Sequence, residues 1–421
     1  MMLIGYGLPS RPITMVLPFA AGGTTDTLVR IIAARMQVLV GQPVIIENVS
    51  GAAGTISLGR AAPRRIYNYC GALADAVYKL PFDLLIFEPV VLLANNPSVN
   101  LIFPAGVVTV VPLSSGAVSL KVFIAGASGY IGGSVAAALM AAGHQVSGLA
   151  RSDETAAALT TLGIRPVHGT LDDTEVLAKA ARDADVTINA ANAGHRAAAA
   201  GILKALAGTG KIFLHTDGSS IVGTRSRGDL VEKVFDEDTL FTPTPQRAAR
   251  MEIDKLVRDA ADNGVRSIVI APSLIYGLGH GLNPHSIQVP WLIKLAKKFA
   301  VAKHIGAGEN RWANVHIDDL MGLYLLAIEK APAGAFYFAE NGENSMREVC
   351  EAISRMLGQG GRTESMTVEE AVIEWGEGPA NDTMGSNSRV RAKRARAELD
   401  WQPKARPLID EIEFGCYVQE T

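Results

Sequence analysis

Residues 121–133 read KVFIAGASGYIGG, and this stretch decides the fold. An apolar run typical of a buried strand is followed by Gly126, Gly129 and Gly132 at G-x-x-G-x-x-G spacing, and a helical pattern then continues to about residue 142. In such a unit the first glycine permits a tight turn, the second lets backbone N–H groups reach a pyrophosphate, and the third lets the helix pack on the strand. The positive end of the helix favours that anion. The stretch therefore predicts a dinucleotide-binding site.

The rest of the chain repeats this alternation of short apolar runs and amphipathic helical runs. Val, Ile and Leu dominate the apolar runs, as in parallel strands that are covered on both faces. The sequence predicts an α/β Rossmann fold, a doubly wound parallel sheet with a small C-terminal substrate subdomain. Strands are expected at 121–127, 145–151, 165–169, 185–191, 211–217 and 266–277, the last two of them buried, and helices near 131–142, 153–162 and 173–182.

Several residues are predicted to line the coenzyme. An acidic residue at the tip of the second strand would bind the ribose 2′-OH of NAD, whereas a basic one suits the 2′-phosphate of NADP. Arg151 stands at that tip, which favours NADP and leaves NAD open. The predicted coenzyme-binding residues are Gly126, Ser128, Gly129, Tyr130, Ile131, Gly132, Arg151, Asp172, Ala190 and Ala191.

Composition limits the class of protein. The chain has 421 residues, 48% hydrophobic and 19% charged, with a net charge of −3, which gives no reason to expect nucleic acid or an anionic membrane as partner. Three scattered cysteines form no metal-ligand pattern, so no metal site is expected. No apolar span is long enough to cross a membrane and no signal peptide is recognisable, so we expect a cytoplasmic protein. The partner expected is a small-molecule substrate, and a homodimer is left open.

The first hundred residues follow a different pattern. RPITMVLPFAAGGTTDTLVRIIAARM and GQPVIIENVSGAAGT predict one strand–helix–strand unit, too small to bury both faces of a sheet. This segment resembles the start of the tripartite-tricarboxylate (Bug-type) solute-binding receptors, a family that grips a carboxylate ligand between two lobes. Only part of one lobe is present. We interpret residues 1–103 as a partial receptor-like fragment and the Pro-, Gly- and Ser-containing residues 104–118 as a linker.

Residues 119–415 resemble the NAD-dependent epimerase/dehydratase type of short-chain dehydrogenase/reductase. The resemblance rests on an ordered set of motifs: GASGYIGG (126–133), HTDGSSIVG (215–223), APSLIYG (271–277), GENRWANVHIDDL (308–320) and ARAELDWQPK (395–404). It implies an NAD(P)-dependent oxidoreductase.

The resemblance also locates a catalytic site and a departure from it. The family uses a Ser/Thr to orient substrate oxygen, a Tyr as acid/base, and a Lys that lowers the tyrosine pKa from about 10. Here Ser219 and Ser220 occupy the serine place, Gln246 stands at the tyrosine position and Arg250 at the lysine position. An amide cannot exchange a proton at ordinary pH, whereas Arg250 keeps a positive charge that could hold the nicotinamide ribose. The predicted catalytic residues are thus Ser219, Ser220 and Arg250.

Other side chains are weaker candidates. Tyr276 ends a predicted strand, where a packing role competes with catalysis, and His316, His280 and His285 could border the substrate pocket. Arg311 and Asp318 match an Arg–Asp motif that joins the subdomain to the coenzyme domain, and an internal salt bridge explains both equally well. Core packing is the preferred interpretation of Trp291 and Trp312.

Together these features predict an oxidoreductase that acts on a small carbonyl, hydroxyl or sugar-nucleotide substrate. Two alternatives remain open: a non-catalytic NAD(P)-binding sensor, which the loss of the tyrosine favours, and a carboxylate-binding receptor fragment with a passenger domain.

Overall fold

The structure is a computed structural model that describes residues 119–420 and five strands before them, at 13–17, 44–48, 91–95, 98–103 and 106–110. The chain divides into two compact units, Met1–Ala117 and Val118–Thr421.

The N-terminal unit contains a parallel strand pair. Strand β1 (Ile13–Leu17) pairs with β2 (Val44–Asn48), with Ile13 opposite Val44. Parallel neighbours require a crossover connection, which is what the predicted strand–helix–strand unit supplies. The two strands are confirmed, and the predicted helix between them lies outside the described residues.

Part of the predicted linker forms a strand. An antiparallel sheet contains β3 (Val91–Asn95), β4 (Ser98–Phe103) and β5 (Gly106–Val110), and β5 falls within residues 104–118. The strand β5 pairs with an apolar stretch of β4, as when Val108 lies opposite Leu101.

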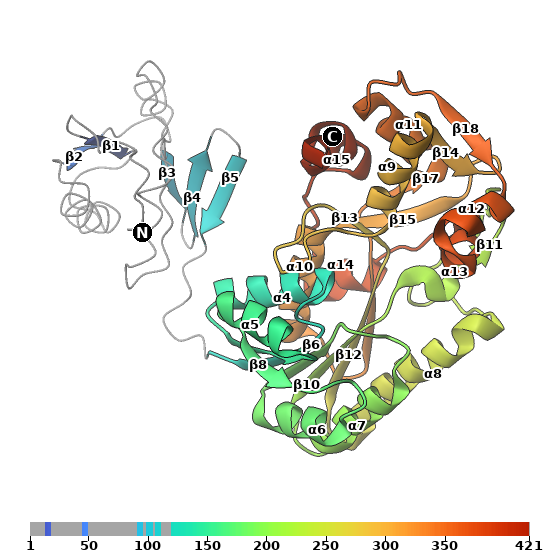
Figure 1. Cartoon of the computed structure of the whole chain (residues 1–421). Helices are drawn as coiled ribbons and strands as arrows, with labels where there is room; N and C mark the ends of the chain where they lie inside the picture. Colours follow the sequence, from blue (N-terminus) through green and yellow to red (C-terminus); the bar gives the residue numbers. More distant parts are fainter. Residues whose placement is uncertain are drawn as a thin grey trace. The chain divides into compact units, whose positions relative to one another are not determined.

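The larger unit is built on a seven-stranded parallel sheet of order β16-β12-β10-β9-β6-β7-β8 (Figure 1). The chain runs outward from β6 to one edge and then returns to the other side of β6, which is the doubly wound arrangement predicted from the sequence. The strands are β6 (Lys121–Ala125), β7 (Gln145–Ala150), β8 (Arg165–His168), β9 (Val186–Asn189), β10 (Ile212–Thr216), β12 (Arg266–Pro272) and β16 (Ala335–Ala339).

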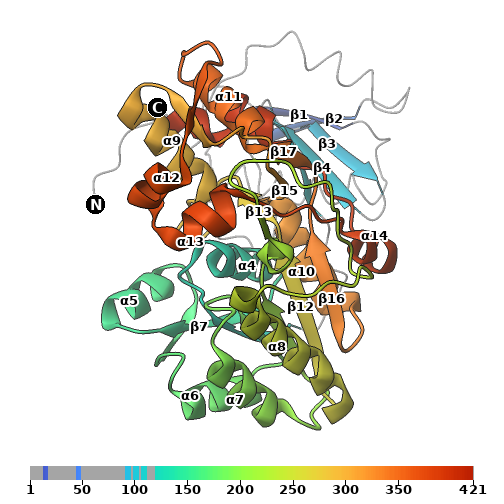
Figure 2. The same ribbon diagram turned by 90° about the vertical axis from the view of Figure 1, so that its right-hand side faces the viewer.

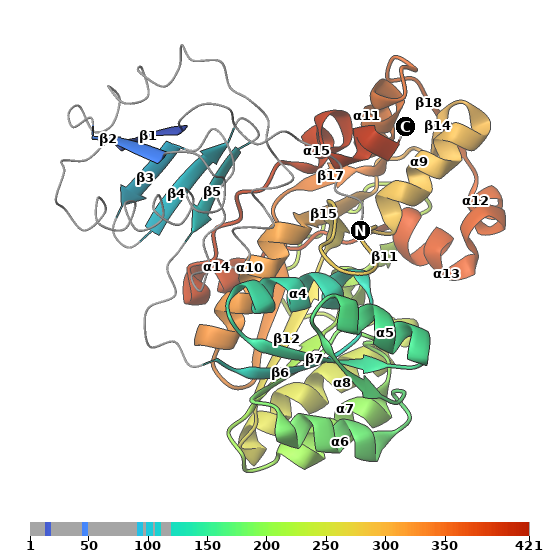
Figure 3. The ribbon, with the colours of Figure 1, turned by 60° about the vertical axis from the view of Figure 1, so that its left-hand side comes forward.

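Helices cover both faces of this sheet, which explains why its central strands are mostly apolar, whereas the edge strand β8 is polar and partly exposed. Phe123, Ile188 and Ile268 are fully buried at its centre. One face carries α4 (Tyr130–Ala141), α5 (Asp153–Thr161) and α10 (Ile317–Lys330). The opposite face carries α6 (Thr174–Asp183), α7 (Arg196–Leu206) and α8 (Pro245–Asp259), as Figure 3 shows.

A smaller subdomain stands at the carboxyl end of the sheet and has its own hydrophobic core (Figure 2). It uses short sheets, β13-β15-β17, β14-β18 and β11-β19. Its strands are β11 (Thr224–Arg225), β13 (Leu274–Tyr276), β14 (Ala302–Ile305), β15 (Arg311–His316), β17 (Glu343–Ser345), β18 (Thr363–Met366) and β19 (Ser386–Asn387). Its helical segments are α9 (Gln288–Phe299), α11 (Met346–Met356), α12 (Val368–Trp375), α13 (Glu377–Pro379), η4 (Ala380–Met384), α15 (Leu408–Phe414) and η5 (Cys416–Glu420). Helix α14 (Lys393–Leu399) instead packs against β16 and α10 and belongs to the core of the large sheet.

The single strand predicted at 266–277 is two strands in two sheets. Strand β12 ends at Pro272, opposite Ala339 of β16, and both the N–H and the hydroxyl of Ser273 then donate to the carbonyl of Ala339. These bonds turn the chain, so that Leu274 begins to pair with Asn314 of β15. Composition alone does not distinguish one long buried strand from two short ones.

No helix within the described residues is both long and apolar enough to span a membrane.

Candidate functional site

The glycine turn after β6 has a geometry that only glycine permits. Gly126 adopts φ +99°, and a Cβ added there would lie 2.7 Å from the carbonyl carbon of Ala190 and 2.8 Å from the nitrogen of Ala191. Strand β9 therefore passes directly against the turn. The predicted coenzyme-lining residues Gly126, Ala190 and Ala191 are brought together by this close approach.

The same turn sets the start of helix α4. The N–H of Gly129 donates to the carbonyl of Gly126 at 2.9 Å, and a Cβ at Gly132 would come within 2.2 Å of that same carbonyl oxygen. Gly129 is the N-cap residue and supplies no side-chain hydrogen bond to the amides of the first turn. Those amides are therefore available to an anion, beside the half-buried Ser128 and Ile131.

This turn lies at the topological switch point of the sheet, because β6 pairs with β7 on one side and with β9 on the other. Open α/β sheets bind their ligands in the crevice outside the carboxyl ends of the strands at such a point. The glycine and alanine backbone here leaves room where larger side chains would block a pyrophosphate. The residues present therefore fit a dinucleotide coenzyme.

Two predicted coenzyme residues lie at neighbouring strand ends. Arg151 follows β7 and is exposed, and no ion pair of residues 119–420 uses its guanidinium. Asp172 follows β8, and its exposed carboxylate lies 3.1 Å from Nε2 of His195, at the start of α7. Both residues follow the carboxyl ends of their strands, which is the end of the sheet at which the glycine turn lies.

The two candidate serines differ in their surroundings. Ser219 is buried in η2 (Ser219–Val222), where Ser388 donates its only hydroxyl proton to the carbonyl of Ser219. In the 2.8 Å hydrogen bond between the two hydroxyls, Ser219 is therefore the donor and Ser388 the acceptor. The hydroxyl of Ser219 is thus committed internally. Ser220 is half-buried and accepts a hydrogen bond of 3.1 Å from Nη1 of Arg250, so its own proton remains available.

Arg250 is held by a buried carboxylate that the sequence reasoning missed. Its Nε donates to Oδ1 of Asp217 at 2.7 Å, and its Nη2 donates to the same oxygen. Gln246 stands one turn earlier, in the first turn of α8. The arginine predicted to take the place of the family lysine therefore bridges the end of β10, at Asp217, and Ser220.

A second buried carboxyl, Asp254, lies beside this pair. Burial raises the pKa of Asp254 well above its usual range, and the neighbouring charge of Asp217 raises it further. The spacing 246, 250 and 254 on one helix face was the available sequence clue, since positions four apart are neighbours.

Of the weaker candidates, Tyr276 and His316 have structural partners. Tyr276 is fully buried, donates to the carbonyl of Arg406 at 2.8 Å and packs edge-on against the ring of His316. His316 caps α10 by accepting from the N–H of Asp318 at 3.2 Å. These contacts agree with the packing role considered for Tyr276.

The loop predicted to border the pocket, 277–286, is attached to the start of α4. Tyr130 donates from its hydroxyl to the carbonyl of Gly277 at 2.8 Å, and the N–H of His280 donates to Ser134 at 3.0 Å. Nε2 of His280 lies 2.6 Å from the carboxylate of Asp318. The side chain of Tyr130 therefore anchors this loop, in which His285 also lies, over the start of α4.

Arg311 and Asp318 do not pair with each other. Arg311 lies 3.3 Å from Glu348, and Asp318 lies beside His280 and His316. Trp312 is buried in the subdomain core and Trp291 packs against it, which confirms core packing for both.

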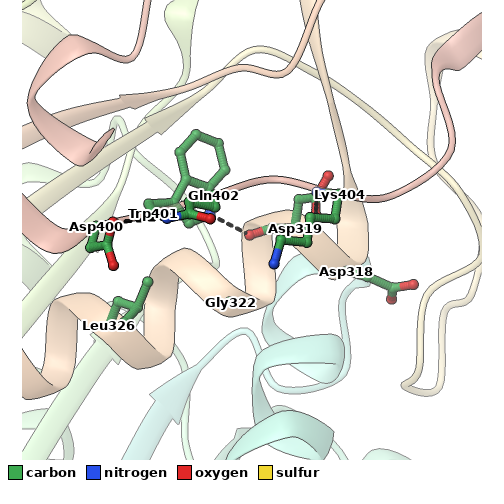
Figure 4. Close-up of a pocket in the computed structure, with 8 residues that line it drawn as sticks. All are labelled: Asp318, Asp319, Gly322, Leu326, Asp400, Trp401, Gln402 and Lys404. Atoms are coloured by element: carbon green, nitrogen blue, oxygen red, sulfur yellow. Dashed lines mark hydrogen bonds between the residues drawn. The ribbon is translucent and has the colours of Figure 1, made fainter. Parts of the chain in front are cut away.

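A pocket of about 360 Å³ lies outside this constellation, between α10 and the tail that follows α14 (Figure 4). Its acidic lining is already used, because Asp319 accepts from the N–H groups of Lys404 and Ala405 while its carbonyl accepts from Trp401. These hydrogen bonds of Asp319 hold the tail against α10, and the pocket does not form part of the candidate site. Among the described residues, no group of three or more His, Cys, Asp or Glu could hold a metal ion.

Known proteins resemble both units of the chain. The N-terminal part is similar to protein BugT of Bordetella pertussis, 34% identical over 82 residues, which cover 20% of this chain and 25% of that protein. A UPF0065 protein of a Pseudomonas strain is 40% identical over 106 residues, covering 23% of this chain and 31% of that protein. A partial receptor-like fragment is thus compatible with these short matches.

The larger unit matches over nearly its whole length. Oxidase ucsJ of an Acremonium species is 33% identical over 338 residues, covering 70% of this chain and 95% of that protein. A farnesyl-dihydroquinoline-oxide ketoreductase of Stigmatella aurantiaca is 28% identical over 247 residues, covering 53% of this chain and 69% of that protein. The solved dTDP-glucose 4,6-dehydratase of Bacillus anthracis, in complex with NAD, superposes with a TM-score of 0.57 at 17% identity, covering 72% and 97% of the two chains.

The family profile agrees with the geometry of the glycine turn. The profile described as the NAD dependent epimerase/dehydratase family matches residues 122–337, which span the strands from β6 to β16. The chain belongs to the NAD dependent epimerase/dehydratase family.

Proposed function

We propose that the protein is an NADP(H)-preferring oxidoreductase that interconverts a carbonyl and a hydroxyl group on a small molecule. The observation that carries this proposal is that two features share one edge of the sheet: the glycine turn at the switch point and Ser220, with its free hydroxyl proton, at the end of β10. In our proposal the bound coenzyme supplies or accepts hydride at the substrate carbon.

The coenzyme would be held by backbone groups and by Arg151. The uncapped amides at the start of α4 would bind the pyrophosphate, with Gly126, Gly132, Ala190 and Ala191 providing the space. The exposed, unpaired Arg151 suits a 2′-phosphate because a planar guanidinium can donate two parallel hydrogen bonds to it. Asp172 would border the adenosine side.

Ser220 and Arg250 would act on the substrate oxygen. Arg250 donates to Ser220, so the serine hydroxyl can donate its own proton in a hydrogen bond to a carbonyl oxygen. Negative charge that develops on that oxygen is then stabilised by the hydroxyl and by the guanidinium behind it. Ser219 would support the turn instead, since its hydroxyl is bound to Ser388.

A second candidate function is a coenzyme-binding sensor without turnover. Three donors of Arg250 are already engaged, by Asp217 and Ser220, and Gln246 cannot supply a proton. For residues 1–103 we propose a receptor-like fragment on which coenzyme binding does not depend.

The deciding experiment compares coenzyme binding and turnover. Calorimetry should show tighter binding of NADPH than NADH to the wild type, and Arg151→Ala should reduce the NADPH affinity about 10- to 100-fold with little effect on NADH. A panel of aldehydes and ketones then tests for NADPH oxidation. Tight binding without turnover would support the sensor, and a coenzyme preference unmoved by Arg151→Ala would remove the NADP assignment. Deletion of residues 1–115 should leave binding intact.

A further inference from the structure

Arg247 is a mostly buried arginine without a hydrogen bond for its guanidinium within the described part of the chain. Its side chain is only 17% exposed, and the one carboxylate of the described residues within 4 Å, that of Asp382, lies 3.9 Å from Nη2. That carboxylate is already taken, because Arg225 donates to its two oxygens at 2.7 and 3.1 Å. A guanidinium carries five N–H donors, which normally find acceptors when they are buried. Those of Arg247 are therefore available to a further acceptor.

The backbone around Arg247 adds to the positive potential. Arg247 lies in the first turn of α8, which contains no acidic residue, so its charge faces the positive end of the helix dipole. Burial is the main influence on the pKa of Arg247 and lowers it; the carboxylates of Asp382 and Asp217 raise this pKa, and the charge of Arg250 lowers it. An arginine is unfavourable for folding at this position, but the same position favours an incoming anion.

The guanidinium of Arg247 has no carboxylate to itself among the described residues. Arg250 is matched by Asp217, and Asp254 is neutral beside them because burial raises its pKa. Arg225 and Arg247 share the carboxylate of Asp382. The third carboxylate near these arginines, that of Glu377, is exposed, faces Arg225 and accepts a hydrogen bond from Asn381.

The cluster lies where α8 faces the substrate subdomain. Arg247 is three residues before Arg250 on α8, so their Cβ atoms are about 5–6 Å apart on one helix face. Asp382 and Arg225 come from η4 and β11, which stand near α13 at the end of the sheet in Figure 1. An anion at Arg247 would therefore lie close to the Ser220–Arg250 pair.

We propose that Arg247, supported by Arg225, binds an oxyanion group of the substrate, so that the protein selects carbonyl or hydroxyl compounds that carry a carboxylate or a phosphate. The reaction at the carbonyl or hydroxyl group rests on the proposed function, whereas binding of the anion at Arg247 does not depend on it. Arg311, the arginine of the predicted Arg–Asp motif, instead pairs with Glu348. Arg247 is thus a specificity-determining residue.

The activity test uses pairs of substrates that differ only in charge. With NADPH as coenzyme, 4-carboxybenzaldehyde should have a KM about 10- to 100-fold lower than that of its methyl ester. For a phosphate group, the matching comparison is the KM of glyceraldehyde 3-phosphate with that of glyceraldehyde. Arg247→Gln should remove the preference by raising KM for the charged member alone. Arg196→Gln is the matched control, because Arg196 also lies 3.9 Å from a carboxylate, that of Glu252, but is 59% exposed on α7.

A binding test separates this inference from the proposed function. Benzoate and inorganic phosphate should raise the melting temperature of the NADP⁺-loaded wild type in a salt-dependent way, whereas benzamide should not, whether or not any carbonyl is turned over. The shift should disappear in Arg247→Gln and persist in Arg196→Gln. Absence of turnover with a retained Arg247-dependent shift would overturn the proposed function and leave the anion site standing.

Other outcomes overturn the anion site itself. Equal shifts with benzoate and benzamide, no shift with either anion, or an unchanged shift in Arg247→Gln would each do so. If Arg247→Gln does not fold, Arg247→Lys keeps the charge without the planar fork and should bind the anion about 3- to 10-fold more weakly. An anion affinity equal to that of the wild type in Arg247→Lys would then count against the assignment.

Discussion

Arg250 donates from both Nε and Nη2 to a single oxygen, Oδ1, of Asp217, and this contact joins helix α8 to the end of strand β10. The Asp217 side chain has no exposed surface, while that of Arg250 is 22% exposed. The guanidinium of Arg250 is therefore fixed in place by Asp217 while it donates a hydrogen bond to Ser220. The cation that the sequence predicts at the position of the family lysine is therefore fixed in direction.

Substitution Asp217→Asn should strongly destabilise the protein. Removal of one partner of a buried ion pair leaves the other charge uncompensated, which typically costs about 3–5 kcal/mol in the free energy of unfolding. Urea denaturation monitored by circular dichroism would measure the loss. Asp183→Asn, which breaks an exposed pair with Lys179 on α6, should leave the free energy of unfolding unchanged within error. Equal effects of the two substitutions would contradict a buried ionised pair.

Asp254 should make stability depend on pH. In the folded protein its pKa is raised, chiefly by burial, so it stays protonated, whereas in the unfolded chain it ionises above about pH 4. The folded state thus holds an additional proton, and the free energy of unfolding should fall as pH rises from about 4 toward the raised pKa. Asp254→Asn should flatten this slope, as measured by urea denaturation at pH 5 and pH 8.

Asp259→Asn is the control for that slope, because Asp259 is exposed near the end of the same helix. It should retain the pH dependence of the wild type. If the curves of wild type and Asp254→Asn run parallel, Asp254 is not protonated in the folded protein.

Two helical glycines should respond in opposite directions to alanine. A Cβ at Gly132 would meet the carbonyl oxygen of Gly126 at 2.2 Å, so Gly132→Ala should cost about 1–3 kcal/mol and weaken coenzyme binding by moving α4 away from β6. Gly322 lies inside α10 with open space around its Cβ position (Figure 4), so Gly322→Ala should stabilise by about 0.5–1 kcal/mol. Thermal denaturation with and without NADPH would measure both, and a neutral Gly132→Ala would argue against the tight turn.

The contact between His280 and Asp318 should be visible by NMR. A hydrogen bond to Asp318 raises the pKa of His280 above its ordinary value of about 6.5. The stabilisation from this contact is fully present below that ordinary value and is lost as pH rises through the raised pKa. Asp318→Asn should return the titration of His280 toward about 6.5, and a wild-type pKa at or below that value would refute the contact.

The substitution Gln246→Tyr tests whether the missing acid limits turnover. A tyrosine one turn before Arg250 restores a proton donor at the family position, and general acid catalysis typically contributes about 10²–10⁴-fold. Because Arg250 is already paired with Asp217, we expect a gain at the lower end of this range. The kcat for carbonyl reduction should increase about 100-fold, and the affinity for NADPH should be unchanged. No gain in kcat would favour the sensor.

The sequence by itself determined the coenzyme turn and most of the sheet. Gly126, Gly129 and Gly132 are separated by fixed short spacings, and the apolar runs around them are local patterns, so both can be recognised without knowledge of distant contacts. The strands β6, β7 and β9 accordingly formed within the predicted stretches. The class of fold follows because a buried parallel strand must be apolar on both faces.

Tertiary structure decided which polar groups meet. Asp217 and Arg250 are 33 residues apart and Ser219 and Ser388 are 169 apart, so no local pattern shows that one serine is occupied and the other free. The same holds for Arg247 beside Asp382, and for the turn at Ser273 that divides one apolar run between two sheets. Local propensity reflects neighbours along the chain, whereas charge pairing and the burial of polar groups depend on where the folded backbone brings distant segments together.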